Sequence, residues 1–342
     1  MTDTALDLDL EAVGSYLTKN LPGFSGPLSA RKFAGGQSNP TYLLETPDRN
    51  YVLRRKPPGT LLKSAHAVDR EYRVQRALAD TPVPVAEMHL LCRDDSVIGS
   101  MFYVMSHVAG RNFPVPTLPE LARAERGAVI DQMNQVLATL HNVDIEAAGL
   151  SDYGPSGSYF ERQLGRWSKQ YRASETGTIH DMDRLMRVLA ERLPPEDGQR
   201  TLVHGDYRID NMIFAETGPT CLAVLDWELS TIGHPFADLA SVIMQWQMPC
   251  GPEGRGLAGI DRDALGLPSD QAFIDSYCAR RGLSEIENFG FYLGFSFFRM
   301  AAILQGVHKR ALDGNASNPA KARQLGGYVP LFAGHGLRAL TG

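Results

Sequence analysis

The 342-residue sequence predicts an α+β protein, with a strand-rich N-terminal part and a mainly helical C-terminal part. Short strands are expected between residues 28 and 56 and within 102–110, and period-two alternation is clear at Val52, Arg54 and Lys56. Apolar stripes of helical period dominate after residue 120. The proline-dense stretch GRNFPVPTLP at 110–119 marks the passage between these parts.

We expect three parts along the chain. Residues 1–24 hold an N-terminal tip and a short amphipathic helix at about Leu10–Asn20. Residues 25–108 form a strand-rich N-lobe, and residues 109–342 form a mainly helical C-lobe.

Secondary structure in the N-lobe follows from turns and periodicity. A helix is expected over 64–79, with Ser64 as its N-cap. Strands are expected at Leu28–Ala34, Thr41–Glu45, Tyr51–Lys56 and within FYVMSHVAG at 102–110.

The sequence of the C-lobe predicts a series of helices and one β-hairpin. The hairpin is formed by Met212–Phe214 and Cys221–Leu225. The Gly- and Pro-rich stretch 249–268 predicts an exposed loop, and a mobile lid is its functional interpretation. Helical segments are expected at 120–141, 156–172, 179–192, Asp238–Trp246, Asp270–Arg281, Glu285–Arg310 and Pro319–Leu340.

The motif HGDYRIDN at 204–211, followed by AVLDWE, carries the chemistry. Asp206 can accept the proton of an attacking hydroxyl and orient its lone pair toward a γ-phosphate. Asn211 offers a neutral carbonyl oxygen and Asp226 an anionic one, and Mg²⁺ prefers such oxygen ligands. Asx-turns and helix caps are the structural alternative for a lone Asp.

A small-residue hairpin precedes the second strand. Its glycines would let backbone N–H groups approach phosphates, whereas an ordinary hairpin turn is the alternative. The segment matches neither the dinucleotide fingerprint nor the Walker-type loop, and GTLLKS at 59–64 lacks the second glycine. The candidate nucleotide-binding residues here are Gly35, Gly36, Gln37, Ser38 and Asn39.

The next strand is basic. Alternation places Val52, Arg54 and Lys56 on one face, where a cation can reach the α- and β-phosphates. We prefer Arg54 as the phosphate-binding cation because of its distance from the loop, and Lys56 is the second candidate. The alternative is that these side chains are solvated charges at the edge of the sheet. Glu71 on the following helix is the candidate partner of that cation; a surface pair with Gln75 is the alternative.

The apolar strand that begins at Phe102 ends in a polar segment that suits a linker between lobes. Its backbone groups can bond an adenine edge, and a plain buried strand is the alternative. The candidate residues are Met105, Ser106, His107 and Val108.

Taken in order, these motifs resemble the aminoglycoside phosphotransferase family, the small-molecule branch of the protein-kinase-like fold. The resemblance spans roughly residues 25–310 and is most specific in H-G-D-x-x-x-x-N and L-D-W-E. KPPG at 56–59, AHAVDREY at 65–72 and DWELSTIGHPFADL at 226–239 are similar to the kinase-like domains associated with acyl-CoA dehydrogenases.

The resemblance implies a bilobal protein-kinase-like fold, with an antiparallel-sheet N-lobe and a mainly helical C-lobe, that uses ATP and Mg²⁺. It makes Asp206 the catalytic base, Asn211 and Asp226 the metal ligands, and Arg54 with Glu71 an ion pair. Many kinases have Lys where this chain has Arg54, and Arg brings a planar fork and a permanent charge. Asp238 is implied to support the catalytic loop through backbone N–H groups.

Two features predict a small-molecule acceptor. Gly205 stands where protein kinases usually have Arg, and only eleven residues separate Asp226 from Asp238, too few for a long activation segment. We expect His204 to pack and hydrogen-bond within the loop. The resemblance suggests a hydroxyacyl acceptor; an aminoglycoside, choline-like or amino-alcohol kinase and a non-catalytic nucleotide-binding module are the alternatives.

Bulk properties exclude several other classes. A net charge of -5 argues against a nucleic-acid binder. The four cysteines form no C-x-x-C pair and are typical of a reducing compartment. The acidic N-terminus is not a secretory signal, and the run 289–298 is too short to span a bilayer. We expect a cytoplasmic protein without membrane partners; the sequence does not indicate its oligomeric state.

Overall fold

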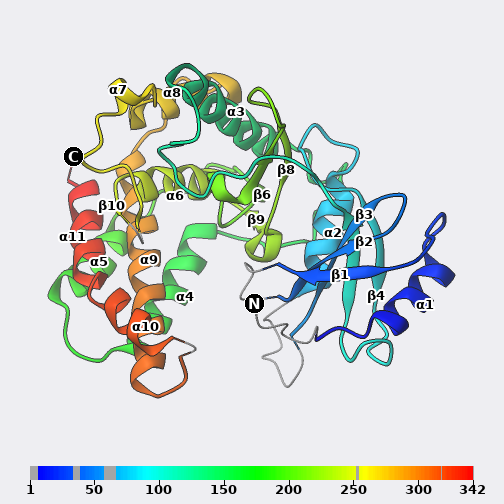
Figure 1. The fold of residues 1–342 in the computed structure, drawn as a ribbon. Helices are drawn as coiled ribbons and strands as arrows, with labels where there is room; N and C mark the ends of the chain where they lie inside the picture. Colours follow the sequence, from blue (N-terminus) through cyan, green and yellow to red (C-terminus); the bar gives the residue numbers. More distant parts are fainter. Residues whose placement is uncertain (1–6, 34–38, 58–66, 252–253, 317, 342) are drawn as a thin grey trace. The chain divides into compact units, whose positions relative to one another are not determined.

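The computed structural model describes residues 7–33, 39–57, 67–251, 254–316 and 318–341 (Figure 1). The chain forms two compact units. Unit 1 comprises Met1–Pro114, Glu146–Leu150 and Ile209–Ser230, and unit 2 comprises Val115–Ile145, Ser151–Arg208 and Thr231–Gly342.

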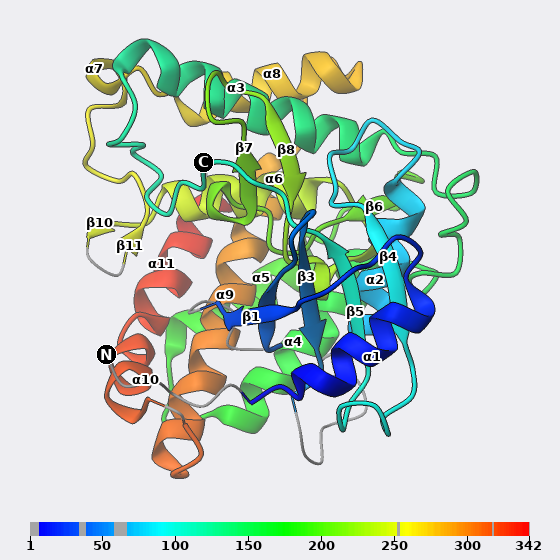
Figure 2. The ribbon, with the colours of Figure 1, turned by 45° about the vertical axis from the view of Figure 1, so that its right-hand side comes forward.

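Unit 1 is built on an antiparallel sheet of strand order β1-β2-β3-β5-β4. Helix α1 (Leu10–Asn20) crosses one side of this sheet and α2 (Val68–Leu78) lies on the other (Figure 2). The strands are β1 (Ser29–Lys32), β2 (Thr41–Glu45), β3 (Asn50–Arg55), β4 (Met88–Cys92) and β5 (Phe102–Ser106). β4 was not predicted, because its sequence MHLLC is an apolar run without clear alternation.

Strand alternation assigns the two faces of the sheet. Phe102 and Val104 of β5 join the core around α1, whereas Tyr103 between them packs in the cluster of α2. In β3, Leu53 belongs to the core around α1, so Arg54 points to the side of α2. This parity places the Arg54 side chain toward Glu71 of α2.

Helix α2 begins later than the sequence predicted. Its N-cap is Ala67, and no side chain caps it. Ser64, the predicted N-cap, lies outside the described residues.

Unit 1 also contains the predicted hairpin. Strands β7 (Met212–Phe214) and β8 (Cys221–Val224) pair in antiparallel fashion. The short helix η1 (Ile209–Asn211) precedes β7, and η2 (Trp227–Leu229) follows β8. The residues before β7 and after β8 therefore meet at one end of the hairpin.

Unit 2 is mainly helical, and α9 (Phe289–Leu312) is its central helix (Figure 1). It packs against α4 (Tyr159–Ser174), α5 (His180–Glu191), α6 (Phe236–Trp246), α10 (Pro319–Gly326) and α11 (Val329–Ala339). Helices α3 (Arg123–His141) and α8 (Asp270–Arg281) pack together. The short strands β6 (Thr201–Val203) and β9 (Thr231–Gly233), which were not predicted, pair in antiparallel fashion.

Two C-terminal predictions need correction. Residues 249–268 are more ordered than a plain loop, because they contain β10 (Cys250–Gly251), β11 (Gly254–Arg255) and α7 (Arg262–Leu265). The single segment expected at Pro319–Leu340 is two helices, since α10 ends at Gly326 and α11 begins at Val329, with a proline in its first turn.

The prediction that the run 289–298 is too short to span a membrane needs correction, because this run is part of the longer helix α9. The helix has 24 residues and is long and apolar enough to span one by length and composition. However, 67% of its most apolar window is buried inside the protein. The apolar composition is therefore explained by its place in the core of unit 2.

Candidate functional site

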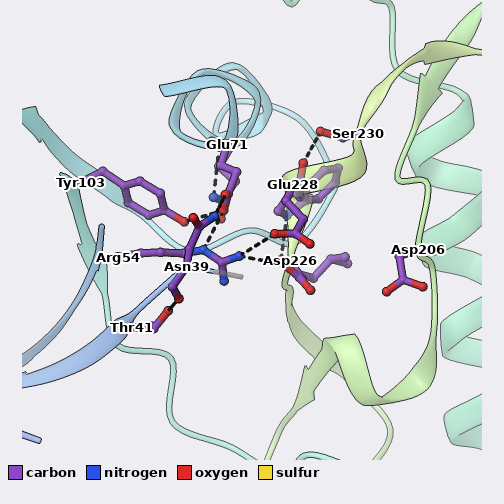
Figure 3. A network of polar contacts seen from close by, with 12 residues as sticks. Asn39, Thr41, Arg54, Glu71, Tyr103, Asp206, Asp226, Glu228 and Ser230 are labelled. Atoms are coloured by element: carbon purple, nitrogen blue, oxygen red, sulfur yellow. Dashed lines mark hydrogen bonds and ion pairs between the residues drawn. The ribbon is translucent and has the colours of Figure 1, made fainter. Parts of the chain in front are cut away.

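The guanidinium of Arg54 lies among three carboxylates of unit 1 (Figure 3). Its Nε atom is 3.0 Å from Glu71 Oε2, and its Nη2 atom is 2.9 Å from Asp226 Oδ1 and 3.5 Å from Glu228 Oε2. We call these four residues the Arg54 cluster. The ion pair that the sequence predicted between Arg54 and Glu71 is therefore present, and β3, α2 and the segment after β8 each contribute to it.

Glu71 receives two further hydrogen bonds. Asn39 Nδ2 donates to Oε1 over 2.8 Å, and Tyr103 Oη donates to Oε2 over 3.1 Å. Asn39 is itself fully buried, and its carbonyl accepts a bond from Thr41 Oγ1. Both oxygens of the buried carboxylate thus have partners, as a buried charge requires.

Burial and neighbouring charges shift the titration of this cluster. The pKa of Glu71 is raised to about 7, because burial and the nearby Asp226 and Glu228 raise it more than Arg54 and Tyr103 lower it. Burial alone would lower the pKa of Arg54, but the adjacent carboxylates outweigh it, so that the pKa is raised. Arg54 is consequently a permanent cation, whereas Glu71 can change protonation near neutral pH.

Asn211 and Asp226, the predicted metal ligands, lie at the same end of the β7–β8 hairpin. Met212 pairs with Val224, and the N–H of Leu225 donates to the carbonyl of Asn211 over 2.7 Å. Asp226 adopts a left-handed conformation with φ of 65° and ψ of 58°. Asp tolerates this region better than most residues, and such outliers cluster at functional sites.

Within the described part of the chain, no group of three or more His, Cys, Asp or Glu side chains is arranged to hold a metal ion. A cation at the hairpin would therefore need ligands from elsewhere. Mg²⁺ commonly meets this need with one or two protein carboxylates and the oxygens of substrate phosphates.

The predicted adenine-binding segment runs from the end of β5. The N–H of Ser106 donates to the carbonyl of Glu87, and that of His107 donates to the carbonyl of Asn50. Among the described residues, no hydrogen bond to the N–H of Val108 is found. The predicted phosphate-loop residues Gly35, Gly36, Gln37 and Ser38 lie outside the described residues.

The loop that carries Asp206 follows β6 in unit 2 and is held by a buried carboxylate. The N–H groups of His204 and Gly205 donate to the two oxygens of Asp238 over 2.6 and 2.8 Å. Asp238 also accepts from the ring of His141, 3.3 Å away. We call Asp238, His141 and Tyr277, which bonds His141, the Asp238 cluster. The predicted support of the loop by Asp238 is confirmed.

One further hydrogen bond and one backbone conformation shape this loop. The ring of His204 is fully buried, and its Nδ1 atom accepts the N–H of Asp206 over 3.2 Å, as expected for a packing residue. Gly205 has φ of 84°, a conformation that favours glycine. This backbone requirement gives a physical reason for Gly205 at this position.

Asp206 is partly exposed, with 33% of its side chain accessible. Its Oδ2 atom is 3.2 Å from Nη2 of Arg208. Arg208 was not singled out from the sequence, although a cation two residues after the candidate base was the available signal. Glu228 lies in the motif AVLDWE, and no role was predicted for it.

The structure brings together Asn39, Arg54, Glu71 and Asp226 through direct contacts, and it places Asn211 beside the hairpin end that carries Asp226. All of these belong to unit 1. Asp206 belongs to unit 2, with its own partners. Lys56, the second candidate for the phosphate-binding cation, has no ion pair among the described residues.

Comparison with known proteins gives a family match and a set of relatives. The model of the phosphotransferase enzyme family matches residues 29–267. Acyl-CoA dehydrogenase family member 10 of Mus musculus is 47% identical over 319 residues, which are 92% of this chain and 30% of the mouse protein. The chain thus spans about a third of the length of that curated relative.

Two solved structures show the fold. The crystal structure of a proposed aminoglycoside phosphotransferase from Ralstonia eutropha has a TM-score of 0.90 and 47% identity, with 98% of each chain covered. Spectinomycin phosphotransferase, solved with ADP and spectinomycin, has a TM-score of 0.64 and 12% identity, with 96% of this chain and 99% of that chain covered. The protein-kinase-like fold predicted from the sequence is confirmed.

Proposed function

Because the chain belongs to the APH family of phosphotransferase enzymes, we propose that it transfers the γ-phosphate of ATP to a hydroxyl group of a small molecule in a Mg²⁺-dependent reaction. The family membership predicted from the sequence is confirmed by the match over residues 29–267. A related fold has been solved with ADP, which supports nucleotide use.

The observation that carries the proposal is the charge of the Arg54 cluster. One guanidinium faces three carboxylates, so an ionised cluster carries an excess of negative charge. Asp226 and Glu228 are also partly exposed, at 33% and 25% of their side chains. Such a cluster favours an added cation, and Mg²⁺ brought with a nucleotide is one.

The donor set fits magnesium. Asp226 would hold the ion through a carboxylate and Asn211 through its carbonyl oxygen, both hard ligands. When bound, Mg²⁺ neutralises the phosphate oxygens and the charge that develops on them. Arg54 supplies a fixed cation for the α- and β-phosphates, and it is paired with Glu71, whose other oxygen accepts a hydrogen bond from Asn39.

Asp206 is the general base in this proposal. It accepts the proton of the acceptor hydroxyl as that oxygen attacks the γ-phosphate, and ADP leaves with the released negative charge. Arg208, 3.2 Å from Asp206, keeps the carboxylate oriented and provides positive charge where the phosphoryl group moves.

The segment Met105–Val108 is the proposed adenine-binding linker. The N–H groups of Ser106 and His107 are occupied by the protein, so the N–H of Val108 is the donor we assign to the base. Gly35, Gly36, Gln37 and Ser38 remain the proposed phosphate-loop residues.

A hydroxyacyl compound is the acceptor that we favour. The guanidiniums of Arg299 and Arg166 lie 5.9 and 5.3 Å from the ring centre of Trp167, and Arg299 also donates to the carbonyl of Gly205. Both cations lower the pKa of the half-buried Tyr159, although burial raises that pKa more. Positive charge this close to the Asp206 loop suits an anionic acceptor better than a polycationic aminoglycoside, a choline-like compound or an amino alcohol.

The relatives add a second reason for this choice, since the mouse relative is named as an acyl-CoA dehydrogenase family member. A non-catalytic nucleotide-binding module is the alternative from another class, and turnover by the purified protein decides between them. We also propose that the protein is cytoplasmic; its net charge of -5 gives no reason to expect nucleic-acid partners.

A two-stage experiment tests the function. Thermal shift with an ATP analogue and Mg²⁺ is measured first, alone and with sugars, aminoglycosides, choline-like amines, amino alcohols, hydroxy acids and hydroxyacyl-CoAs. ATP turnover is then followed with each acceptor that adds to the shift. We expect turnover with a hydroxyacyl compound, retained in Asp275→Asn, a variant on the exposed face of α8, and lost in Asp206→Asn. Nucleotide binding without turnover by any acceptor would favour the non-catalytic module.

A further inference from the structure

A chain of buried hydrogen bonds leads from helix α8 to the loop that carries Asp206. Tyr277 Oη lies 2.7 Å from Nδ1 of His141, and His141 Nε2 lies 3.3 Å from Oδ2 of Asp238. Asp238 then accepts the N–H groups of His204 and Gly205. Tyr277, His141 and Asp238 are all buried, with at most 2% of each residue exposed.

The protons in this chain can be assigned from the chemistry of its ends. Asp238 accepts hydrogen bonds and cannot donate when ionised, so the proton between it and His141 is on Nε2. Nδ1 is then an acceptor, and Tyr277 donates its phenolic proton to it. Every polar atom of the His141 ring is thereby used.

The charge states agree with this assignment. Burial lowers the pKa of His141, and Arg281 lowers it too, although Asp238 acts in the opposite direction. Burial would raise the pKa of Asp238, but His141, His204 and the N–H of Gly205 outweigh burial and lower it. A neutral imidazole therefore bridges a phenol and a carboxylate at neutral pH.

This series of hydrogen bonds ends at Gly205, the residue before the proposed base Asp206. Gly205 is held on both sides, because its N–H donates to Asp238 and its carbonyl accepts from Arg299 over 3.0 Å. A shift of Asp238 would therefore move the backbone that enters Asp206. Catalytic geometry is sensitive to such shifts, since about 1 Å of misplacement can cost about 10²-fold in rate.

Helix α8 does not depend on Tyr277 for its attachment to α3. Asn134 donates to the carbonyl of Phe273 over 2.7 Å, and Arg280 pairs with Asp131 over 2.7 Å and with Asn134 over the same distance. Loss of one phenol oxygen should leave these contacts in place. The hydrogen-bond chain can therefore be perturbed while the helices stay packed.

We propose that Tyr277 and His141 are positioning residues, which orient the Asp238 carboxylate and through it the backbone of the catalytic loop. This inference rests on the proposed phosphotransferase function. Neither residue touches the reacting atoms in this proposal, so they act on the rate of the chemical step and not on nucleotide affinity.

Three variants and one matched control test the proposal. Tyr277→Phe removes the phenol donor, His141→Ala removes the bridge, and His141→Gln keeps one N–H donor for Asp238. We expect kcat to fall about 5-fold in Tyr277→Phe and about 10²-fold in His141→Ala, with His141→Gln between them. KM for ATP should stay near the wild-type value, and the unfolding midpoint of Tyr277→Phe should fall modestly, because Nδ1 of His141 loses its donor.

Tyr171→Phe is the matched control. Tyr171 is fully buried in α4 of the same unit, and its hydroxyl has no hydrogen-bond partner among the described residues. Removal of this hydroxyl should leave kcat unchanged. If Tyr277→Phe behaves like Tyr171→Phe and His141→Gln rescues nothing relative to His141→Ala, the positioning role is wrong.

Amide hydrogen exchange separates this inference from the proposed function. The segment 203–206 should exchange faster in Tyr277→Phe and His141→Ala than in the wild type or in Tyr171→Phe. Unchanged exchange would overturn the inference whatever the activity. A wild-type protein without ATP turnover would contradict the proposed function, while the exchange measurement would still decide whether the hydrogen-bond chain holds the loop.

Discussion

The Arg54 cluster and the Asp238 cluster both hold buried carboxylates, but they balance the charge in different ways. In the Arg54 cluster one guanidinium faces Glu71, Asp226 and Glu228, so an excess of negative charge remains. In the Asp238 cluster neutral donors, namely two backbone N–H groups and an imidazole, surround a single carboxylate.

This difference separates a site that awaits a ligand from one that fixes geometry. Like charges held together cost stability, and proteins retain them where a cation or substrate completes the set. A fully hydrogen-bonded buried carboxylate is complete without a ligand and specifies one orientation of its neighbours. We therefore expect substitutions in the two clusters to affect stability and activity in different proportions.

The largest effect on stability is expected from Arg54→Met. This variant leaves three carboxylates facing one another without their cation, and loss of one partner of a buried ion pair costs about 3–5 kcal/mol. Urea unfolding measures the loss. Arg54→Lys keeps the charge and serves as the control, so its loss should be smaller. Equal losses in both variants would show that packing and not charge matters at this position.

Asp238→Asn should cost about 3 kcal/mol, because an amide N–H₂ would face a backbone donor of His204 or Gly205. Activity should fall as well, since the loop loses its anchor. Thermal unfolding and ATP turnover are measured on the same preparation. A stable but inactive Asp238→Asn protein would contradict the structural part of this expectation.

Asp226→Asn should lower activity strongly without lowering stability. It removes the anionic metal ligand, so phosphoryl transfer should fall by at least about 10²-fold. Stability should be unchanged or raised, because Arg54 keeps Glu71 and Glu228 while one repulsive carboxylate disappears. Chemical unfolding without Mg²⁺ tests this point. A marked loss of stability would mean that Asp226 is a structural residue.

The smallest effect expected is a pH dependence of the folding stability that is due to Glu71. The pKa of the buried group is raised to about 7 from its ordinary 4.5, so the folded state favours the protonated form. The resulting stability is fully present below pH 4.5 and is lost as pH rises through about 7. Between pH 5 and 8 we expect a loss of about 2 kcal/mol that Glu71→Gln does not show. Parallel pH profiles for both proteins would contradict the assignment.

Much of the Arg54 cluster could be predicted because it depends on local rules. Strand parity selected Arg54, and helix position selected Glu71. The bonds that Asn39 and Tyr103 make to Glu71 could not be predicted, because their partner is distant in sequence and is set by packing on the sheet. The same holds for Glu228, whose role depends on the turn after β8.

The Asp238 cluster was less accessible from the sequence. Its carboxylate and loop were expected, but His141 and Tyr277 are separated by 136 positions and resemble ordinary core residues. Strands β6 and β9 have three residues each, too few for a periodic signal. Long-range polar contacts of this kind can be predicted only when the arrangement of the helices in space is known.

The transfer of a labelled phosphoryl group tests the central claim most directly. Purified protein is incubated with Mg²⁺, ATP labelled with ¹⁸O in the γ-phosphate and the acceptor selected by thermal shift, and the products are analysed by mass spectrometry. We predict a labelled phosphate ester on the acceptor with the wild type, formed about 10²–10⁴-fold more slowly by Asp206→Asn. Tight nucleotide binding with no ester from any hydroxyl acceptor, or full activity of Asp206→Asn, would contradict the proposed reaction.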